Sequence, residues 1–406
     1  MTESPREDVV AQQYEKWTYP EPIQNLETFL ANNWQWFDPS HAHRILWPDR
    51  PQNAELDILI AGCGTNQAAQ IAYTNRASKV VAVDVSQPSL DHEKFLKEKY
   101  GLKNLELKLL PIEEIPSLNQ KFDLVMSTGV LHHMDSPKVG MKALADVMRP
   151  DAVAAIMLYA RYGRAGVEIM QAVFRDMGLK QDEESLQMVK AAVASLGPNH
   201  PLQSYIAIAP DLNFDAGVVD TFLHGRDVSF TVDDCIDLVS SAGLEFQDWF
   251  LKSPYYPPTL TEPGNEFYAA VNQLPNEKMW SVMERINTLN GCHFFLATHA
   301  DRPKSAYRID FSSANALNYV PLFRLRCGVG GQDIYRHDWT VRLDPTHLAF
   351  AQYINGELSI REIAAKVAQS GLLSADQAEL ELIALELFEN LWRFDFIAID
   401  LTGTTA

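Results

Sequence analysis

Short apolar runs alternate with longer stretches of helical spacing through the first part of the chain. The runs expected to form strands are Leu56–Ala61, Lys79–Asp84, Leu105–Leu110, Phe122–Ser127 and Val153–Tyr159. Helical patterns occupy Pro88–Tyr100 and Ser136–Val147, and Arg149-Pro150-Asp151 is a turn signal ahead of the fifth strand. Strands that alternate with helices in this way predict a parallel sheet with helices on both faces.

Two further strand candidates follow, Leu244–Leu251 and His293–Ala297, and long connections lead to each of them. A mostly helical stretch near 166–242 precedes the first, and a second such stretch near 254–291 precedes the other. Both connections exceed the ~2–6 residues of ordinary loops. We therefore expect two helical insertions on the side of the sheet where ligands bind.

The pattern changes after residue 300. A polar stretch, Asp301–Asn318, is typical of a linker. Ser359 and Glu362 have the spacing of a helix capping box, a longer amphipathic helix is expected over Ala375–Phe394, and Phe396–Leu401 could close the domain as a strand. Helices followed by a short strand predict a small α+β, winged-helix-like module.

The length of 406 residues fits two or three domains at ~100–200 residues each. We expect an N-terminal arm over 1–50, an α/β domain over 51–302 and a C-terminal accessory domain over 303–406. The accessory domain is expected to recognise a ligand, assist the formation of a homodimer or regulate the α/β domain.

The formal net charge of −19 argues against a nucleic-acid partner, because phosphate binding normally needs a basic face. A winged helix often binds DNA, but this chain is acidic. The same charge disfavours docking on an anionic membrane surface.

Four single cysteines, Cys63, Cys235, Cys292 and Cys327, form no Cys-x-x-Cys pair, so neither a cysteine-based zinc site nor a disulfide scaffold is expected. The first eight residues are polar and acidic, without the apolar core of a signal peptide. No run of ~18 apolar residues occurs along the sequence. These features predict a protein of the reducing cytoplasm that does not span a membrane.

A glycine turn at the end of the first strand is the strongest local signal for chemistry. Gly62 and Gly64 let the backbone approach a ligand closely, and Asn66 stands where a third glycine often lies. Asp84 ends the second strand, roughly 20 residues further on, where a carboxylate can accept both hydroxyls of a ribose. The pair fits either NAD or S-adenosylmethionine (SAM).

Three segments in order resemble class I SAM-dependent methyltransferases: Ile60–Thr65, Val80–Asp84 and Phe122–Met134. The resemblance implies a Rossmann-like seven-stranded sheet whose last strands are antiparallel, with SAM as cofactor. It places Gly62, Gly64, Thr65 and Asn66 under the methionine part of SAM and Asp84 on the ribose. Pro111 replaces a common aspartate, which leaves Ile112, Glu113 and Glu114 as the candidates near adenine.

A narrower resemblance involves Tyr14–Pro22, Leu158–Gln171 and Asp220–Thr231. These segments resemble a bacterial branch that includes protein lysine methyltransferases and methyltransferases fused to repeat arrays. In that branch the N-terminal segment folds over the SAM pocket, which implies a lid role for Tyr14 and Tyr19. The stretch that begins at Asp220 would face the substrate cavity.

Histidines are the candidate catalytic groups. His132 and His133 follow the fourth strand, at the mouth of the expected SAM site, and an imidazole of pKa ~6.5 suits a general base. His133 is the first choice, and a histidine that only packs is the alternative. His224 could act as a base or hold substrate, or it could simply pair with Asp227.

Tyr159, Arg161 and Arg164 follow the fifth strand, where an arginine could clamp a substrate carboxylate, and Asp227 is a further candidate for substrate contact. The alternative is that these arginines only balance an acidic surface. The residue types of His132, His133, Asp135 and His224 would suit zinc or iron, but adjacent histidines point in different directions, so we expect no metal there.

These observations predict a SAM-dependent methyltransferase that moves a methyl group to an O or N atom of a small polar metabolite. The transfer would be an in-line SN2 displacement with a histidine as general base. Two alternatives remain, a protein lysine methyltransferase and a SAM-binding regulatory protein without turnover. An NAD oxidoreductase is the weakest reading.

Overall fold

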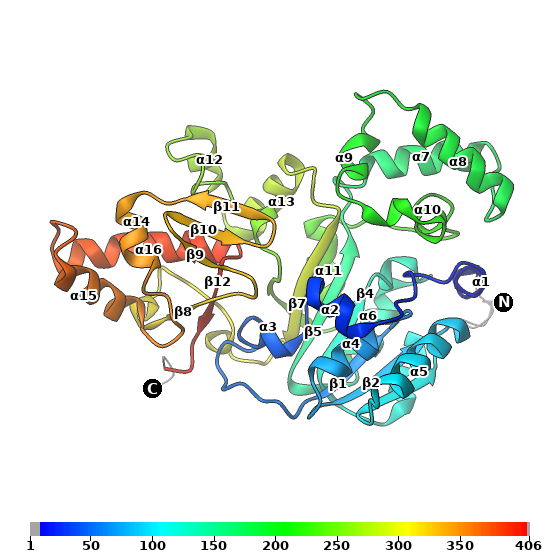
Figure 1. Ribbon diagram of the computed structural model, residues 1–406, viewed down its shortest axis with the longest axis horizontal. Coiled ribbons are helices and arrows are strands. Elements are labelled where there is room, and N and C mark those ends of the chain that lie inside the picture. Colours follow the sequence, from blue (N-terminus) through cyan, green and yellow to red (C-terminus); the bar gives the residue numbers. More distant parts are fainter. Residues whose placement is uncertain (1–8, 404–406) are drawn as a thin grey trace. The chain divides into compact units, whose positions relative to one another are not determined.

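Seven strands form one mixed sheet in the computed structural model, which describes residues 9–403 (Figure 1). Their order across the sheet is β3-β2-β1-β4-β5-β7-β6, and β7 runs antiparallel to both of its neighbours. The strands are β1 Asp57–Ala61, β2 Lys79–Asp84, β3 Leu105–Leu109, β4 Phe122–Thr128, β5 Met148–Tyr159, β6 Leu244–Trp249 and β7 Cys292–His299. The predicted sheet, including its antiparallel last strands, is confirmed.

The apolar runs of the sequence form the parallel strands, because these strands are covered on both faces. Ile58–Ala61 of β1 are completely buried, as are Leu124–Met126 of β4. Helices α4 (Gln67–Thr74), α5 (Gln87–Tyr100) and α6 (Pro137–Ala145) connect the strands. Parallel sheets need such covering helices, which is why their strands are apolar throughout rather than alternating.

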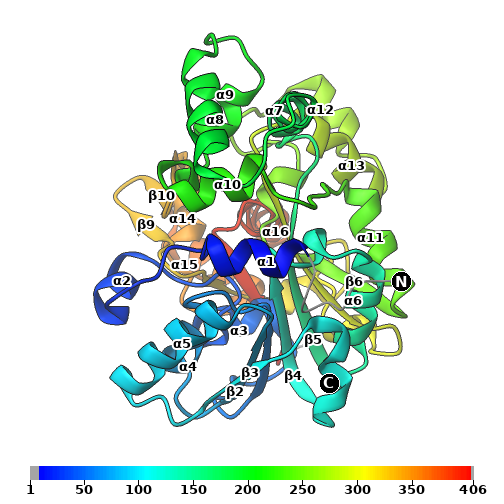
Figure 2. The same cartoon turned by 90° about the vertical axis from the view of Figure 1, so that its right-hand side faces the viewer.

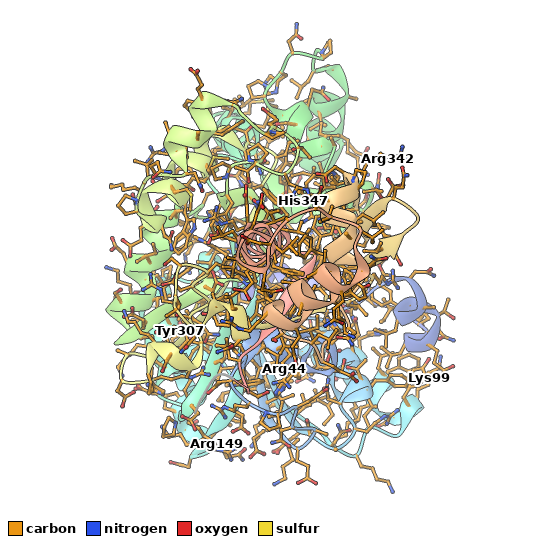
Figure 3. All side chains as sticks on the ribbon, turned by 90° about the vertical axis from the view of Figure 1, so that its left-hand side faces the viewer. Arg44, Lys99, Arg149, Tyr307, Arg342 and His347 are labelled. Atoms are coloured by element: carbon orange, nitrogen blue, oxygen red, sulfur yellow. The ribbon has the colours of Figure 1, made fainter. Side chains whose placement is uncertain are left out.

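The fifth strand begins earlier than the sequence predicts. Pairing with β4 jumps from Phe122↔Met148 to Leu124↔Val153, so the predicted turn at 149–151 bulges out within β5. A proline is tolerated in a strand at such a bulge. The Arg149 guanidinium, labelled in Figure 3, binds Asp57 and Asp123 at the starts of the neighbouring strands and fixes the bulge.

Helices α7–α10 gather beyond the carboxyl ends of the parallel strands, with α1 between them and the sheet (Figures 1 and 2). The helices of the arm and the first insertion are α1 Val9–Lys16, α2 Leu26–Asn32, α7 Ala165–Asp176, α8 Glu183–Ser195, α9 Leu202–Ile206, α10 Asp215–Phe222 and α11 Val232–Ser241. A separate apolar cluster holds α7–α10 together, with Val167, Phe174, Leu186, Leu202 and Val219 buried in it.

Contacts divide the chain into two compact units. The first contains the chain up to Phe37, Ala54–Trp249 and Glu284–Ala300, and the second contains Asp38–Asn53, Phe250–Met283 and the chain from Asp301 onward. Residues 1–8 of the predicted arm lie outside the described residues.

The second unit contains two small sheets and a helical layer. Its strands are β8 Val320–Phe323, β9 Gly328–Gly330, β10 Asp333–Arg336, β11 Trp339–Arg342 and β12 Ile397–Asp400, and its helices are α3 Pro39–Leu46, α12 Glu266–Val271, α14 Pro345–Ala351, α15 Ile360–Ser370 and α16 Gln377–Arg393. Helix α13, Asn276–Ile286, spans the division between the units. The capping box of Ser359 and Glu362 begins α15 as predicted. The winged-helix assignment stays a prediction.

The units differ from the predicted domains, because residues 38–53 and 250–283 group with the C-terminal part. The Leu401 N–H donates to the Pro48 carbonyl at 2.7 Å, and Arg44 pairs with Asp400 at 2.7 Å. The buried Asp395 carboxylate accepts the Lys252 N–H at 2.9 Å. Such distant pairings leave no local trace in the sequence.

Among the described residues, the structure contains no helix of the length and apolar character needed to cross a membrane.

Candidate active site

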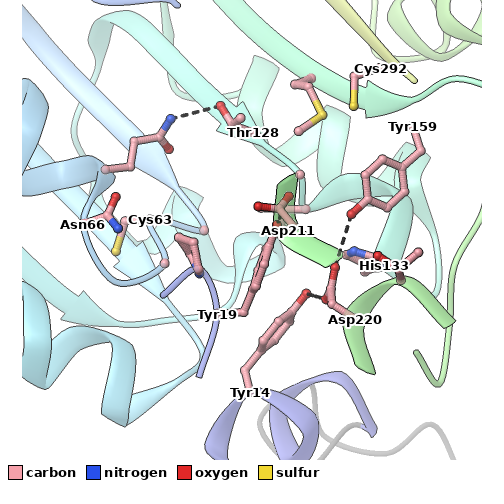
Figure 4. Close-up of a pocket in the computed structure, with 18 of the residues that line it drawn as sticks. Tyr14, Tyr19, Cys63, Asn66, Thr128, His133, Tyr159, Asp211, Asp220 and Cys292 are labelled. Atoms are coloured by element: carbon pink, nitrogen blue, oxygen red, sulfur yellow. Dashed lines mark hydrogen bonds between the residues drawn. The ribbon is translucent and has the colours of Figure 1, made fainter. Parts of the chain in front are cut away.

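A cavity of about 500 Å³ lies at the carboxyl ends of β1, β2, β4 and β5, within the first unit (Figure 4). Its volume is in the range of small-molecule sites. The arm, the loops after these strands, the first insertion and the start of β7 all contribute to its wall.

The glycine turn forms one side of the cavity, and glycine is required there. Gly62 has a φ of +79°, and a Cβ on it would lie 2.4 Å from Val130 Cγ2. Gly64 and Asn66 also line the cavity. Thr65 lies behind the wall, where its hydroxyl donates to the Pro20 carbonyl at 2.8 Å and holds the arm on the turn.

Asp84 lies beside this turn, as the sequence predicts. Its Oδ2 accepts the Gly64 N–H and its Oδ1 accepts the Ser86 N–H, each at 2.9 Å. Burial raises the pKa of this carboxyl group. Each oxygen keeps a further lone pair, so the group can still accept a ligand diol.

Of the residues expected near adenine, Ile112 lines the cavity, and Glu113 is not among its lining residues. The 3₁₀ turn η1, Ile112–Leu118, buries Ile112 and Ile115, which leaves Glu113 at the partly exposed position between them. The wall at this end is therefore apolar, with Leu110 beside Ile112.

Two tyrosines of the arm close the cavity onto the first insertion. Tyr14 Oη donates to Asp220 Oδ1 at 2.9 Å, and Tyr19 Oη donates to Asp211 Oδ2 at 2.8 Å. Burial, together with the Asp220 carboxylate, raises the pKa of both phenols well above the usual value, so both stay neutral donors. The role of Tyr14 and Tyr19 as a lid over SAM stays a prediction.

His133 is the histidine that reaches the cavity. Its Nδ1 lies 2.9 Å from the Arg226 carbonyl oxygen, which can only accept, so Nδ1 carries the proton and Nε2 keeps a lone pair. The turn that places it, η2 (Leu131–His133), follows β4 directly. The role of His133 as a general base stays a prediction.

His132 and His224 support His133 from the two sides. His132 stacks on Tyr159 with ring centroids 3.8 Å apart, and its Nδ1 accepts the Tyr159 N–H at 3.2 Å. His224 stacks on His133, also at 3.8 Å. Neither is among the lining residues, and burial lowers the pKa of both well below the usual value. Both are neutral packing partners here.

His133, Asp220 and His224 offer ligand atoms within 4.8 Å of one another, and two histidines with a carboxylate are a familiar metal set. However, His224 Nδ1 accepts the Arg226 N–H at 3.0 Å, which leaves the proton on the Nε2 of the neutral ring. A protonated nitrogen cannot be a ligand. These residues therefore do not fit a metal ion, and the absence of a metal stays a prediction.

The predicted arginine clamp does not reach the cavity. Arg164 is buried, with Nη2 2.8 Å from Asp227 Oδ2 and Nη1 2.7 Å from Tyr205 Oη. Its guanidinium lies 3.6 Å from the centroid of the Tyr159 ring, and Tyr159 does line the cavity. Arg161 is about half-exposed and donates to the Ser229 carbonyl. Arg164 and Asp227 thus hold the wall from behind.

Sequence reasoning missed several residues of the wall. Asp220 accepts hydrogen bonds from Tyr14, Tyr159 and Gln13; the sequence predicted that the stretch beginning at Asp220 faces the cavity but gave Asp220 itself no role. Tyr205, on α9, and Asp211, on the 3₁₀ helix η3 (Pro210–Asn213), carried no such signal. Cys292 enters the wall from the start of β7.

Comparison with known proteins places these observations in context. A family described as "Methyltransferase domain" matches residues 59–156. An uncharacterized protein of Synechococcus is 24% identical over 374 residues, which are 90% of this chain and 87% of that protein. A tRNA U34 carboxymethyltransferase of Saccharophagus degradans is 29% identical over 143 residues, 35% of this chain and 42% of the relative.

Among solved structures, PKMT2 from Rickettsia typhi superposes with a TM-score of 0.66 at 15% identity. It covers 91% of this chain and 76% of its own. This likeness shows a shared fold. A malonyl-[acyl-carrier protein] O-methyltransferase of Acetivibrio thermocellus is 26% identical over 34% of this chain and 47% of its own length. The chain therefore spans less than half of these two named methyltransferases.

Proposed function

Because this chain is a SAM-dependent methyltransferase with a class I domain, we propose that it methylates an O or N atom of a small polar metabolite. The acceptor would bind in the cavity at the carboxyl end of the sheet. SAM, when bound, supplies an electrophilic methyl group on a sulfonium.

The residues present fit SAM. The Gly62 turn offers a surface without Cβ atoms, Asp84 offers carboxylate oxygens to a ribose, and Ile112 offers an apolar contact to adenine. All three face one cavity large enough for a nucleoside and an acceptor. The hydroxyl of Thr65 supports the arrangement by fixing the arm on the turn.

The observation that carries the proposal is the tautomer of His133. The Arg226 carbonyl fixes the proton on Nδ1, and the lone pair of Nε2 is left for the proton that an O or N acceptor must lose. The His132 ring meets this imidazole edge-on and the His224 ring stacks on it, and together they keep it from turning away. His133 would thus remove the proton as the new bond forms.

Closure of the cavity favours a small acceptor. Tyr14 and Tyr19 bond across it to Asp220 and Asp211, and no lysine or arginine is among the described residues of its wall. A tRNA acceptor, as in the name of one relative, would need basic contacts that the net charge of −19 disfavours. Protein lysine methylation is the second candidate, supported by the motif resemblance of Tyr14–Pro22 and Asp220–Thr231.

The test measures S-adenosylhomocysteine (SAH) release with a panel of small polar acceptors and a lysine peptide, using the full chain and His133→Asn. Asparagine can keep the hydrogen bond to the Arg226 carbonyl and lacks the second nitrogen. We expect kcat to fall about 10²–10⁴-fold with SAH affinity unchanged. His347→Asn, a partly exposed change in the other unit, is the control. A variant that keeps the native kcat would refute the role of His133.

A further inference from the structure

Resting on the proposed function, we infer that the acceptor is the nitrogen of an alkylammonium group, held by Asp220 and the phenol oxygens around it. Asp220 lies on α10 and is 2% exposed. Figure 4 shows it between Tyr14 and Tyr159, with His133 close by. The argument depends on which protons this part of the wall can still donate.

The phenol protons of Tyr14, Tyr159 and Tyr19 already donate to carboxylates of the protein. Tyr14 Oη donates to Asp220 Oδ1 at 2.9 Å, and Tyr159 Oη donates to Asp220 Oδ2 at 3.2 Å. Tyr19 donates in the same way to Asp211 at 2.8 Å. A hydroxyl that has donated its single proton presents only lone pairs to a ligand. The three oxygens are therefore acceptors toward the cavity, and they suit a ligand that carries N–H donors.

The charge of the wall points the same way. The charged side chains that line it are Asp84, Asp211 and Asp220, and none of the described lining residues is a lysine or an arginine. Arg164 is the nearby cation, and it is turned behind Tyr159, where it is paired with Asp227. An anionic acceptor would meet carboxylates that no lysine or arginine of the wall neutralises, whereas an ammonium would pair with them.

Tyrosine faces add to this preference, because a cation over an aromatic ring is attracted by its quadrupole. Tyr14, Tyr19, Tyr159 and Tyr205 all line the cavity. The acceptor half thus combines rings, lone pairs, the buried carboxylate of Asp220 and the exposed carboxylate of Asp211. This combination recognises an alkylammonium group better than an alcohol or a carboxylate of the same size.

The step balances with groups already named. The ammonium gives one proton to Nε2 of His133, and its nitrogen lone pair forms the N–C bond to the methyl group. The C–S bond breaks with its electron pair left on sulfur. Neutral SAH, a methylated ammonium and a protonated imidazole result, with the total charge unchanged.

The experiment compares three probes of one chain length, butylammonium, butan-1-ol and butyrate, by titration into the protein saturated with SAH. We expect butylammonium to bind at least tenfold more tightly than the other two. Equal or tighter binding of butan-1-ol or butyrate would overturn the inference. If SAH itself fails to bind, the proposed function fails instead, so the two failures are distinguishable.

Variants locate the effect. Asp220→Asn keeps the shape and removes the charge, and it should weaken butylammonium at least tenfold with SAH affinity within threefold of native. Asp215→Asn is the matched control, since Asp215 lies on the same helix with an exposed side chain paired to Lys190. Tyr159→Phe provides a second variant in case Asp220→Asn unfolds. An Asp220→Asn protein that binds SAH and butylammonium as the native one does would overturn the inference.

The source of the ammonium is settled by turnover. SAH release with butylamine but not with a lysine peptide that has a free ε-amine and an acetylated N-terminus assigns a small amine, and the reverse assigns a protein side chain. Release only with hydroxyl or carboxylate acceptors would contradict the inference in either case.

Discussion

The ion pair behind the cavity, Arg164 with Asp227, offers the sharpest test of how the site is held. Both side chains are buried, with 1% and 6% of their surface exposed. Replacing Arg164 by methionine leaves the Asp227 carboxylate buried with Gln171 as its remaining donor at 2.8 Å. Breaking a buried pair by removing one partner costs about 3–5 kcal/mol.

Methionine also removes the guanidinium from the Tyr159 ring and from the Tyr205 hydroxyl, so the full cost should lie at the upper end of that range. For a unit of this size, this corresponds to a melting temperature lower by about 10 °C. The double variant Arg164→Met/Asp227→Leu removes both charges. It should cost less than the two single changes together by about 2 kcal/mol.

The assay is urea unfolding of the four proteins of this cycle, with and without SAH. SAH at about 100 times its Kd raises the stability of the unit that binds it by about 2.7 kcal/mol, which identifies the relevant transition. If the free-energy losses of the two single variants simply added up in the double variant, or if Arg164→Met lost less than about 1 kcal/mol, the pair would not be a buried, mutually dependent ion pair that supports the wall.

Two further predictions concern the turn and the helix behind it. Gly62→Ala should reduce SAH affinity strongly, because the new Cβ would lie 2.4 Å from Val130. Gly178→Ala, also at positive φ but in open space, is the control and should leave SAH affinity intact. Calorimetric titration measures both affinities, and equal values would contradict the prediction. Glu93 is buried under the N-terminus of α4, accepting the Ala68 and Ala69 N–H groups, and burial raises its pKa to about 8. Since the pKa of Glu93 in the folded state exceeds the unfolded value of ~4.3, its contribution to stability is present at low pH and is lost as the pH rises through 8. Glu93→Gln should therefore make the free energy of unfolding less dependent on pH between pH 5 and 8. An unchanged slope would contradict this prediction.

Much of the sheet and of the cofactor half could be predicted because their signals are local. β2 begins and ends at the predicted residues, since a strand buried on both faces must be a continuous apolar run. Gly62 needs a backbone conformation that other residues avoid, and Asp84 ends its strand beside it. Such features depend on neighbours in sequence or on one parallel pairing.

The acceptor half could not be predicted in the same way. The sequence predicted that Arg164 clamps a substrate carboxylate. A buried guanidinium needs a counter-charge, however, and Asp227 provides it from 63 residues away in the chain. Asp220 meets Tyr14 across 206 residues, a pairing that only the folded insertion creates. The sequence by itself determined the strands of the large sheet, the glycine turn and the carboxylate beside it, because backbone sterics and burial act locally. The tertiary structure decided which charges face the cavity and which are neutralised behind it, because desolvated charges are fixed by partners that distant segments bring together.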